Sequence, residues 1–200
     1  MVEAATLVTP TLANDRLVLR PWCSADATEL HDAVRESVAG VGRWLPWCNA
    51  DYGLEHAEAW TTQCRDHWRT GEQFAFAMRN AAGGELLGGC GLNQFNAVHR
   101  SANLGYWVRT SRHGQGIAAA AARLVARFGF AELGLIRIEI VTLPDNHASR
   151  RVAAKLGAVF EGMARQRLWA WDRAHDAAVY ALIPADLDQP SAAHSAATSS

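Results

Sequence analysis

Three strand-like segments separated by very short turns constrain the fold more than any other feature of this sequence. Residues 74–80, 85–95 and 101–109 are rich in apolar and aromatic side chains, and the segments between them read AAGG and NAVHR. Turns of this length and composition are typical of β-hairpins. Strands joined in this way are antiparallel neighbours, so we expect an antiparallel sheet in the middle of the chain.

The elements on either side predict one domain that mixes helices and strands. Periodicity and turn residues predict strands at 16–22, 137–143, 158–170 and 176–183, and helices at 24–38, 54–71, 117–131 and 148–157. The order predicts an α+β fold with a mixed, mostly antiparallel central sheet and about four flanking helices. We expect a single domain over residues 14–186, a flexible N-terminus at 1–13 and a disordered tail at 187–200.

Composition excludes several classes of function. The net charge is −1 and no long Lys/Arg run occurs, so we expect neither nucleic acid nor a membrane surface as a main partner. The 4 cysteines are widely spaced and the 8 histidines show no metal-ligand spacing, so we expect no metal site. No secretory signal and no long apolar run is present, which predicts a cytoplasmic protein.

A glycine turn precedes the alanine-rich helix and indicates an anion site. The segment HGQGIA places Gly114 and Gly116 where backbone N–H groups can face a phosphate. A Walker A loop would require GK[ST], which is absent. The segment does satisfy G-x-G-x-x-A, with Glu139 as the ribose-binding acid, but no second βαβ half follows. A dinucleotide site is therefore the weaker alternative to a pyrophosphate cradle.

Several motifs in register resemble the GCN5-related N-acetyltransferase (GNAT) superfamily. HGQGIA resembles its [QR]-x-x-G-x-[GA] motif, with Gly116 and Ala118 at the small positions. RLVLRPW, RWLPW, ANLGYWVR, DNHASRRVAAKLG and FEGMAR resemble the RimJ/RimL branch, which acetylates ribosomal-protein N-termini. The resemblance covers about residues 14–186. It implies the GNAT fold, with a V-shaped splay in the sheet, and acetyl-CoA as co-substrate.

The resemblance also implies which residues bind coenzyme A. The strand before the turn offers backbone groups of Trp107 and Val108 to the pantetheine arm, and the Val108 N–H faces the thioester oxygen. Asn146 matches an asparagine that binds the pantetheine, although an N-cap of the helix that follows is the alternative. His113 departs from the motif's Gln/Arg, so Arg112 or Arg151 is expected to supply positive charge. The turn itself contributes Gly114, Gln115, Gly116, Ile117 and Ala118.

Proton transfer is less completely specified. The position of the usual tyrosine acid is Ala153, whereas the RimL-like pattern has a serine, Ser149, which we expect to protonate the thiolate. Ser149 could equally be an N-cap of the helix that follows. Asn103 replaces the usual glutamate base, so Glu36 is our expected base; the alternative is a solvated carboxylate at a helix end.

Tryptophans and asparagines are the candidates for binding the acceptor. Trp44 and Trp47, in RWLPW, are expected to wall the acceptor cleft, although core packing is the alternative. Asn93 and Asn103 are expected to add polar contacts.

The sequence thus predicts an N-acetyltransferase in which an amine attacks acetyl-CoA directly in a ternary complex. The acceptor is a protein N-terminal α-amine or a small-molecule amine, and the protein is a monomer or a homodimer. Two alternatives remain open. One is an acyl-CoA-binding module without activity, because both usual proton-handling positions are empty; the other is a transferase for another acyl-CoA such as succinyl-CoA.

Overall fold

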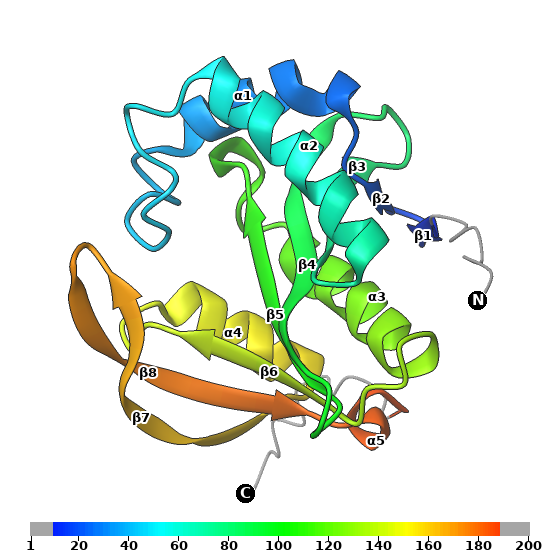
Figure 1. The fold of residues 1–200 in the computed structure, drawn as a ribbon, viewed down its shortest axis with the longest axis vertical. Helices are drawn as coiled ribbons and strands as arrows, with labels where there is room; N and C mark the ends of the chain where they lie inside the picture. The colour runs from blue at the N-terminus through cyan, green and yellow to red at the C-terminus, as the bar shows by residue number, and fades with distance from the viewer. Residues whose placement is uncertain (1–9, 189–200) are drawn as a thin grey trace, which may run out of the picture.

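A computed structural model describes residues 10–188 of the chain (Figure 1). One eight-stranded sheet with the order β1-β2-β3-β4-β5-β6-β8-β7 forms the centre of the fold. Every strand pair is antiparallel except β5–β6. The strands are β1 (Leu12–Ala13), β2 (Leu17–Pro21), β3 (Phe74–Asn80), β4 (Leu86–Asn96), β5 (Ser101–Val108), β6 (Arg137–Thr142), β7 (Val159–Ala170) and β8 (Arg173–Leu182). The predicted fold class and the antiparallel β3–β4–β5 unit are confirmed.

Five α-helices and two short 3₁₀ turns complete the described part of the chain. They are η1 (Ser24–Asp26), α1 (Ala27–Ser37), α2 (Leu54–Thr70), η2 (Thr110–Arg112), α3 (Ile117–Ala131), α4 (His147–Leu156) and α5 (Pro184–Asp188). Four of the α-helices correspond to those predicted. Neither α5 nor β1 was predicted, because each is too short to show a periodic pattern. The predicted flexible and disordered ends lie mostly outside the described residues, but Leu12–Ala13 pair with β2 and α5 extends to Asp188.

The sheet opens between β5 and β6. These parallel strands pair only where Ser101, Ala102 and Asn103 face Arg137, Ile138 and Glu139. From Leu104 onward β5 pairs only with β4, and β5 and β6 diverge in Figure 1. The predicted V-shaped splay is therefore present, and it leaves one side of the second half of β5 without a partner strand.

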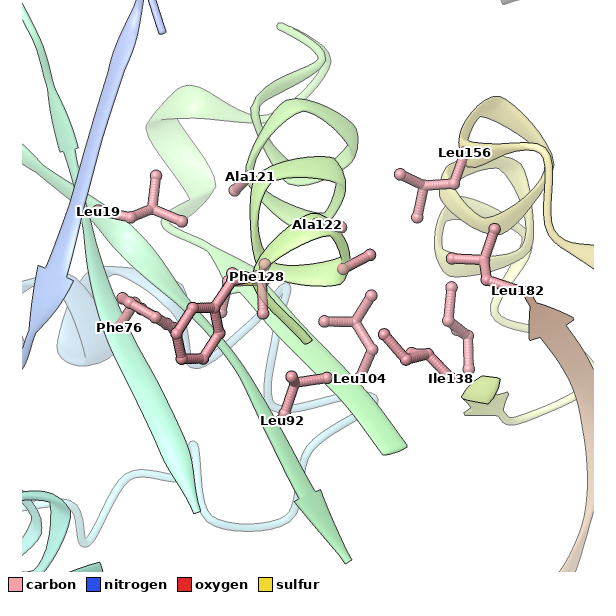
Figure 2. Close-up of a cluster of buried hydrophobic side chains, with 14 of the residues drawn as sticks. Leu19, Phe76, Leu92, Leu104, Ala121, Ala122, Phe128, Ile138, Leu156 and Leu182 are labelled. Atoms are coloured by element: carbon pink, nitrogen blue, oxygen red, sulfur yellow. The ribbon is translucent and has the colours of Figure 1, made fainter. Parts of the chain in front are cut away.

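Helix α3 packs on the sheet through a surface of small residues. Ala121, Ala122 and Phe128 lie against Leu19, Phe76, Leu92 and Leu104 (Figure 2). The alanines bring the helix close to the sheet, and Phe128 fills the space beside Phe76 at a ring distance of 5.6 Å. The spacing of Ile117, Ala121, Leu124, Phe128 and Ala131 predicts one buried apolar stripe, and this is partly wrong, because Leu124 is half-buried and Ala131 is exposed. The buried face also includes Val125 and Ala126, since the sheet covers more of the helix than one narrow stripe.

A buried carboxylate ties the first helix to two strands. Asp26 accepts hydrogen bonds from Arg20 of β2 at 2.8 and 2.6 Å, from Arg79 of β3 at 2.6 Å and from the Cys23 N–H at 2.9 Å. Its side chain does not cap α1. Burial disfavours the charged form, but these hydrogen bonds outweigh burial and lower the pKa of Asp26 from 3.8 to about 2.

We expect Asp26→Asn to lower the free energy of unfolding at pH 7 by about 1.5–3 kcal/mol, because it removes the charged hydrogen-bond acceptor of the half-buried Arg20 and Arg79. The pKa of Asp26 is lower in the folded protein, so its contribution is present above about pH 4 and is lost as the pH falls towards 2. Urea unfolding across this range measures it. Asp26→Asn should lose less stability between pH 4 and pH 2 than the wild type, and equal losses would contradict this account.

Candidate active site

A cavity of about 1470 Å³ follows the splay of the sheet. The glycine turn, β4, β5 and α4 contribute to its lining, together with the loop between α1 and α2 and the tip of the β7–β8 hairpin. In Figure 1 this loop and this tip lie on the same side of the molecule. The cavity therefore connects the predicted coenzyme-binding turn with the predicted acceptor loop.

The register of β5 decides which of its backbone groups face the gap. The Arg109 N–H donates to the Leu87 carbonyl at 2.9 Å, so alternate residues such as Trp107 direct their backbone groups towards β4. The N–H groups of Tyr106 and Val108 consequently face the opening. This geometry agrees with the role expected for Val108. For Trp107 it differs from the expectation, because only its indole ring, not its backbone, is turned to the cavity.

The glycine turn has the geometry of an anion cradle. Gly114 and Gly116 have φ of 78° and 75°, which only glycine adopts readily, and a Cβ on either would meet no atom within 4 Å. The first N–H groups of α3, those of Ile117, Ala118 and Ala119, precede the first intrahelical bond, from Ala120 to Gly116. These donors and the positive helix end suit the pyrophosphate of coenzyme A.

Helix α4 contributes two basic side chains to the cavity that the glycine turn lines. Arg112 is held by Glu85 in a two-point ion pair, at 3.1 and 2.9 Å, which neutralises much of its charge. Arg151 and Lys155 both line the cavity, one helical turn apart on α4. Of the two arginines expected to compensate for His113, Arg151 is therefore the better placed. Lys155 was missed, although its i, i+4 spacing from Arg151 was visible in the sequence.

His113 acts on the end of β5. Its Nε2 lies 2.7 Å from the carbonyl oxygen of Val108, which makes Nε2 the protonated nitrogen. The ring thereby fastens the turn to the last residue of the strand. The sequence had assigned this position to the phosphates, and the structure shows a positioning contact that it did not suggest.

Ser149 is coupled to a tyrosine that the sequence analysis missed. Ser149 Oγ lies 3.0 Å from Tyr106 Oη, which also donates to the Ser149 carbonyl at 3.1 Å. The N-cap of α4 is Asn146, whose Oδ1 accepts from the Ser149 N–H at 3.1 Å. The alternative reading of Ser149 as the cap is therefore wrong. Burial raises the pKa of Tyr106 above its ordinary value, so the phenol stays protonated and serves as a donor.

Glu36 does not take the place expected of a base. Its carboxylate pairs with Arg109 and accepts a hydrogen bond from the Ser111 N–H at 2.8 Å. The Arg109 hydrogen bond is the main cause that lowers its pKa to about 2. Glu36 is also not among the residues that line the cavity. This weakly basic carboxylate holds the η2 turn through the Ser111 N–H. The one carboxylate among the residues that line the cavity is Asp51.

The acceptor side of the cavity is aromatic. Trp47 is 41% exposed and contacts Trp107 and Tyr52, with ring centroids 5.6 and 6.2 Å apart. Trp44 also lines the cavity, with the Arg43 guanidinium 5.0 Å from its ring. The core-packing alternative is thus excluded for Trp47. Asn93 and Asn103 lie in the same lining and bond to each other at 2.9 Å.

Within residues 10–188, no helix is long and apolar enough to cross a membrane. No three His, Cys, Asp or Glu side chains in this part gather closely enough to hold a metal ion.

The splayed sheet, the glycine turn and the cavity that joins them define an enzyme of acyl-CoA-dependent acyl transfer. Residues 16–159 match the acetyltransferase (GNAT) domain, so the chain belongs to the GNAT acetyltransferase family. The resemblance found in the sequence is confirmed, and acetyl-CoA is the co-substrate of this acetyltransferase.

Relatives connect the chain with the RimJ/RimL branch. It is 29% identical to "Putative ribosomal N-acetyltransferase YdaF" of Bacillus subtilis over 85% of this chain and 92% of that protein. It is 33% identical to the ribosomal-protein-serine acetyltransferase of Escherichia coli, over 50% of this chain and 55% of that protein. Mycobacterium smegmatis RimJ, solved with CoA-disulfide, superimposes with a TM-score of 0.77 at 27% identity, covering 92% of this chain and 90% of that one.

We expect Gly116→Val to weaken acetyl-CoA binding by more than about tenfold, because a branched side chain fills the space over the first N–H groups of α3. Gly71→Val is the matched control. Gly71 has the same φ of 75° and the same open surroundings, but it ends α2 away from the cavity. Both variants should lose about 1–2 kcal/mol of stability from backbone strain. Calorimetry measures the affinity, and equal affinities for the two variants would contradict the cradle.

Proposed function

We propose that this enzyme acetylates the N-terminal α-amine of a protein, with a ribosomal protein as the acceptor. The observation that carries the proposal is the ion pair of Glu36 with Arg109, which keeps the expected base out of the cavity lining and leaves Asp51 as the one carboxylate among the lining residues. Such a site suits an amine that is already partly neutral. The names of the relatives, which refer to ribosomal proteins, support the same class of acceptor.

The acidity of the amine decides between α- and ε-amino groups. An α-amine has a pKa near 8, so about a tenth of it is neutral at pH 7, whereas a lysine amine with a pKa near 10.4 is neutral in fewer than about one molecule in a thousand. Water can remove the proton of the α-amine without a carboxylate base. The aromatic opening formed by Trp47 and Tyr52 gives a peptide chain a surface on which to lie.

The chain supplies two groups to the chemical step. The Val108 N–H, turned to the gap, stabilises the negative charge on the thioester oxygen as the neutral amine attacks. Ser149 Oγ donates its proton to the departing sulfur, and in this step the Tyr106 hydroxyl, 3.0 Å away, turns its single proton to Ser149 Oγ and holds that oxygen in place. The N–C bond forms, the C–S bond breaks as the tetrahedral intermediate collapses, the nitrogen loses its extra proton to water, and solvent returns a proton to Ser149.

We expect a peptide with a free N-terminus and no lysine to be acetylated with a kcat/KM at least about 100-fold higher than a lysine peptide with a blocked N-terminus, given the difference in pKa. Thiol release measures the rate, and mass spectrometry locates the acetyl group. Faster modification of the lysine, or of a polyamine, would contradict the proposed acceptor. Activity with succinyl-CoA equal to that with acetyl-CoA would point to the broader acyl transferase.

We expect Ser149→Ala to lower kcat by about 100-fold or less, because a thiolate is a good leaving group and water can partly replace the acid. The dissociation constant of acetyl-CoA should not change, and the free energy of unfolding should fall by only about 0.5–1.5 kcal/mol, because Asn146 caps α4 and Ser149→Ala removes only the hydrogen bond to Tyr106. Tyr106→Phe should lower kcat in the same direction. Unchanged kcat in both variants would show that the proton comes from solvent.

A further inference from the structure

Gly105, in the middle of β5, is a glycine that the fold itself does not require. Its φ lies outside the left-handed region, and a Cβ built on it meets no atom within 4 Å. Glycine weakens a strand interior because it costs conformational entropy and packs nothing. Its partner Gly91 differs, since a Cβ there would lie 2.6 Å from the Phe74 carbonyl oxygen. Packing explains Gly91, whereas Gly105 only preserves empty space.

The space over Gly105 belongs to the acceptor side of the cavity. Side chains alternate along a strand, so Gly105 shares its face with Asn103 and Trp107, two residues away on either side. Gly91 and Asn93 lie directly opposite Gly105 and Asn103 on β4. All five residues line the cavity. Gly91 and Gly105 thus form a glycine floor between the Asn93–Asn103 amides and the Trp107 indole.

The two amides present a donor and an acceptor to this space. Asn103 Nδ2 donates to Asn93 Oδ1 at 2.9 Å, which is the one side-chain hydrogen bond that either amide makes with the described residues. Asn103 Oδ1 and Asn93 Nδ2 therefore remain for a ligand. One acceptor beside one donor is the complement of a peptide unit, with its N–H and its carbonyl.

We propose that the glycine floor and the Asn93–Asn103 pair form the subsite for the start of the acceptor chain, an inference that rests on the proposed function. The missing side chain of Gly105 provides the room for the first side chain of the acceptor. The amide pair lies about 16 Å along β5 from Val108 and binds a peptide unit beyond the first residue. The order along β5, from Val108 through Gly105 to Asn103, then matches the order along the acceptor: reacting amine, first side chain, later peptide unit.

The test compares Gly105→Ala with the control Gly83→Ala. Gly83 lies in the exposed β3–β4 turn, also with an ordinary φ and no atom within 4 Å of a built Cβ, and it does not line the cavity. Both variants should melt at or above the wild-type temperature, since alanine restricts the unfolded chain. Gly105→Ala should lower kcat/KM for an Ala- or Ser-initiated peptide by about 10-fold to 200-fold, and less for a Gly-initiated one. The affinity of Gly105→Ala for acetyl-CoA should equal that of the wild type. Gly83→Ala should equal the wild type both in this affinity and in kcat/KM for every peptide.

Each other outcome is decisive. Equal kcat/KM for Gly105→Ala and the wild type on every peptide overturns the subsite alone. A loss of acetyl-CoA affinity in Gly105→Ala as large as its loss of kcat/KM also overturns the subsite, because it would place Gly105 on the acetyl-CoA side of the cavity. A wild type that acetylates no peptide overturns the proposed function and the subsite with it. Should Gly105→Ala not fold, wild-type rates decide: they should fall as the first residue grows from Ser to Trp, and a flat series overturns the subsite.

Discussion

The separation of β5 from β6 after three residue pairs is the constraint on which the site depends. Had the two strands continued to pair, the N–H groups of Tyr106 and Val108 would be consumed by β6 and no gap would exist. Because the strands part, the N–H groups of Tyr106 and Val108 have no partner strand on the side of β5 that faces the gap. The cavity, the oxyanion donor and the approach from both faces all follow from this single departure from regular pairing.

Helix α3 supplies the second half of the site because it begins where β5 ends. The η2 turn and the two left-handed glycines reverse the chain over a few residues, so the positive end of α3 lies beside the mouth of the gap. His113 joins these two parts by bonding to Val108. The glycine turn and the end of β5 are therefore held as one unit.

Charges near the site are divided between binding and scaffolding. Arg151 and Lys155 lie on the cavity, where anionic groups are expected. Arg109 and Arg112 are instead engaged by Glu36 and Glu85 around the η2 turn. The ion pairs of Arg109 and Arg112 hold the backbone of the η2 turn, which leads into the glycine turn. The hydrogen bond from Arg109 is the main cause of the low basicity of Glu36. This low basicity is consistent with the proposed α-amine acceptor, which needs no carboxylate base.

The sequence by itself determined the elements, the antiparallel centre and the glycine turn, because periodicity, short hairpin turns and glycine at left-handed positions act locally. It also determined the family, since several motifs occur in one order. Only the tertiary structure decided the partners of side chains that are distant in the chain, such as Tyr106 with Ser149 and Glu36 with Arg109. Those pairings depend on how α1, β5 and α4 converge, and the pKa values of the groups follow from that convergence, which no local pattern encodes.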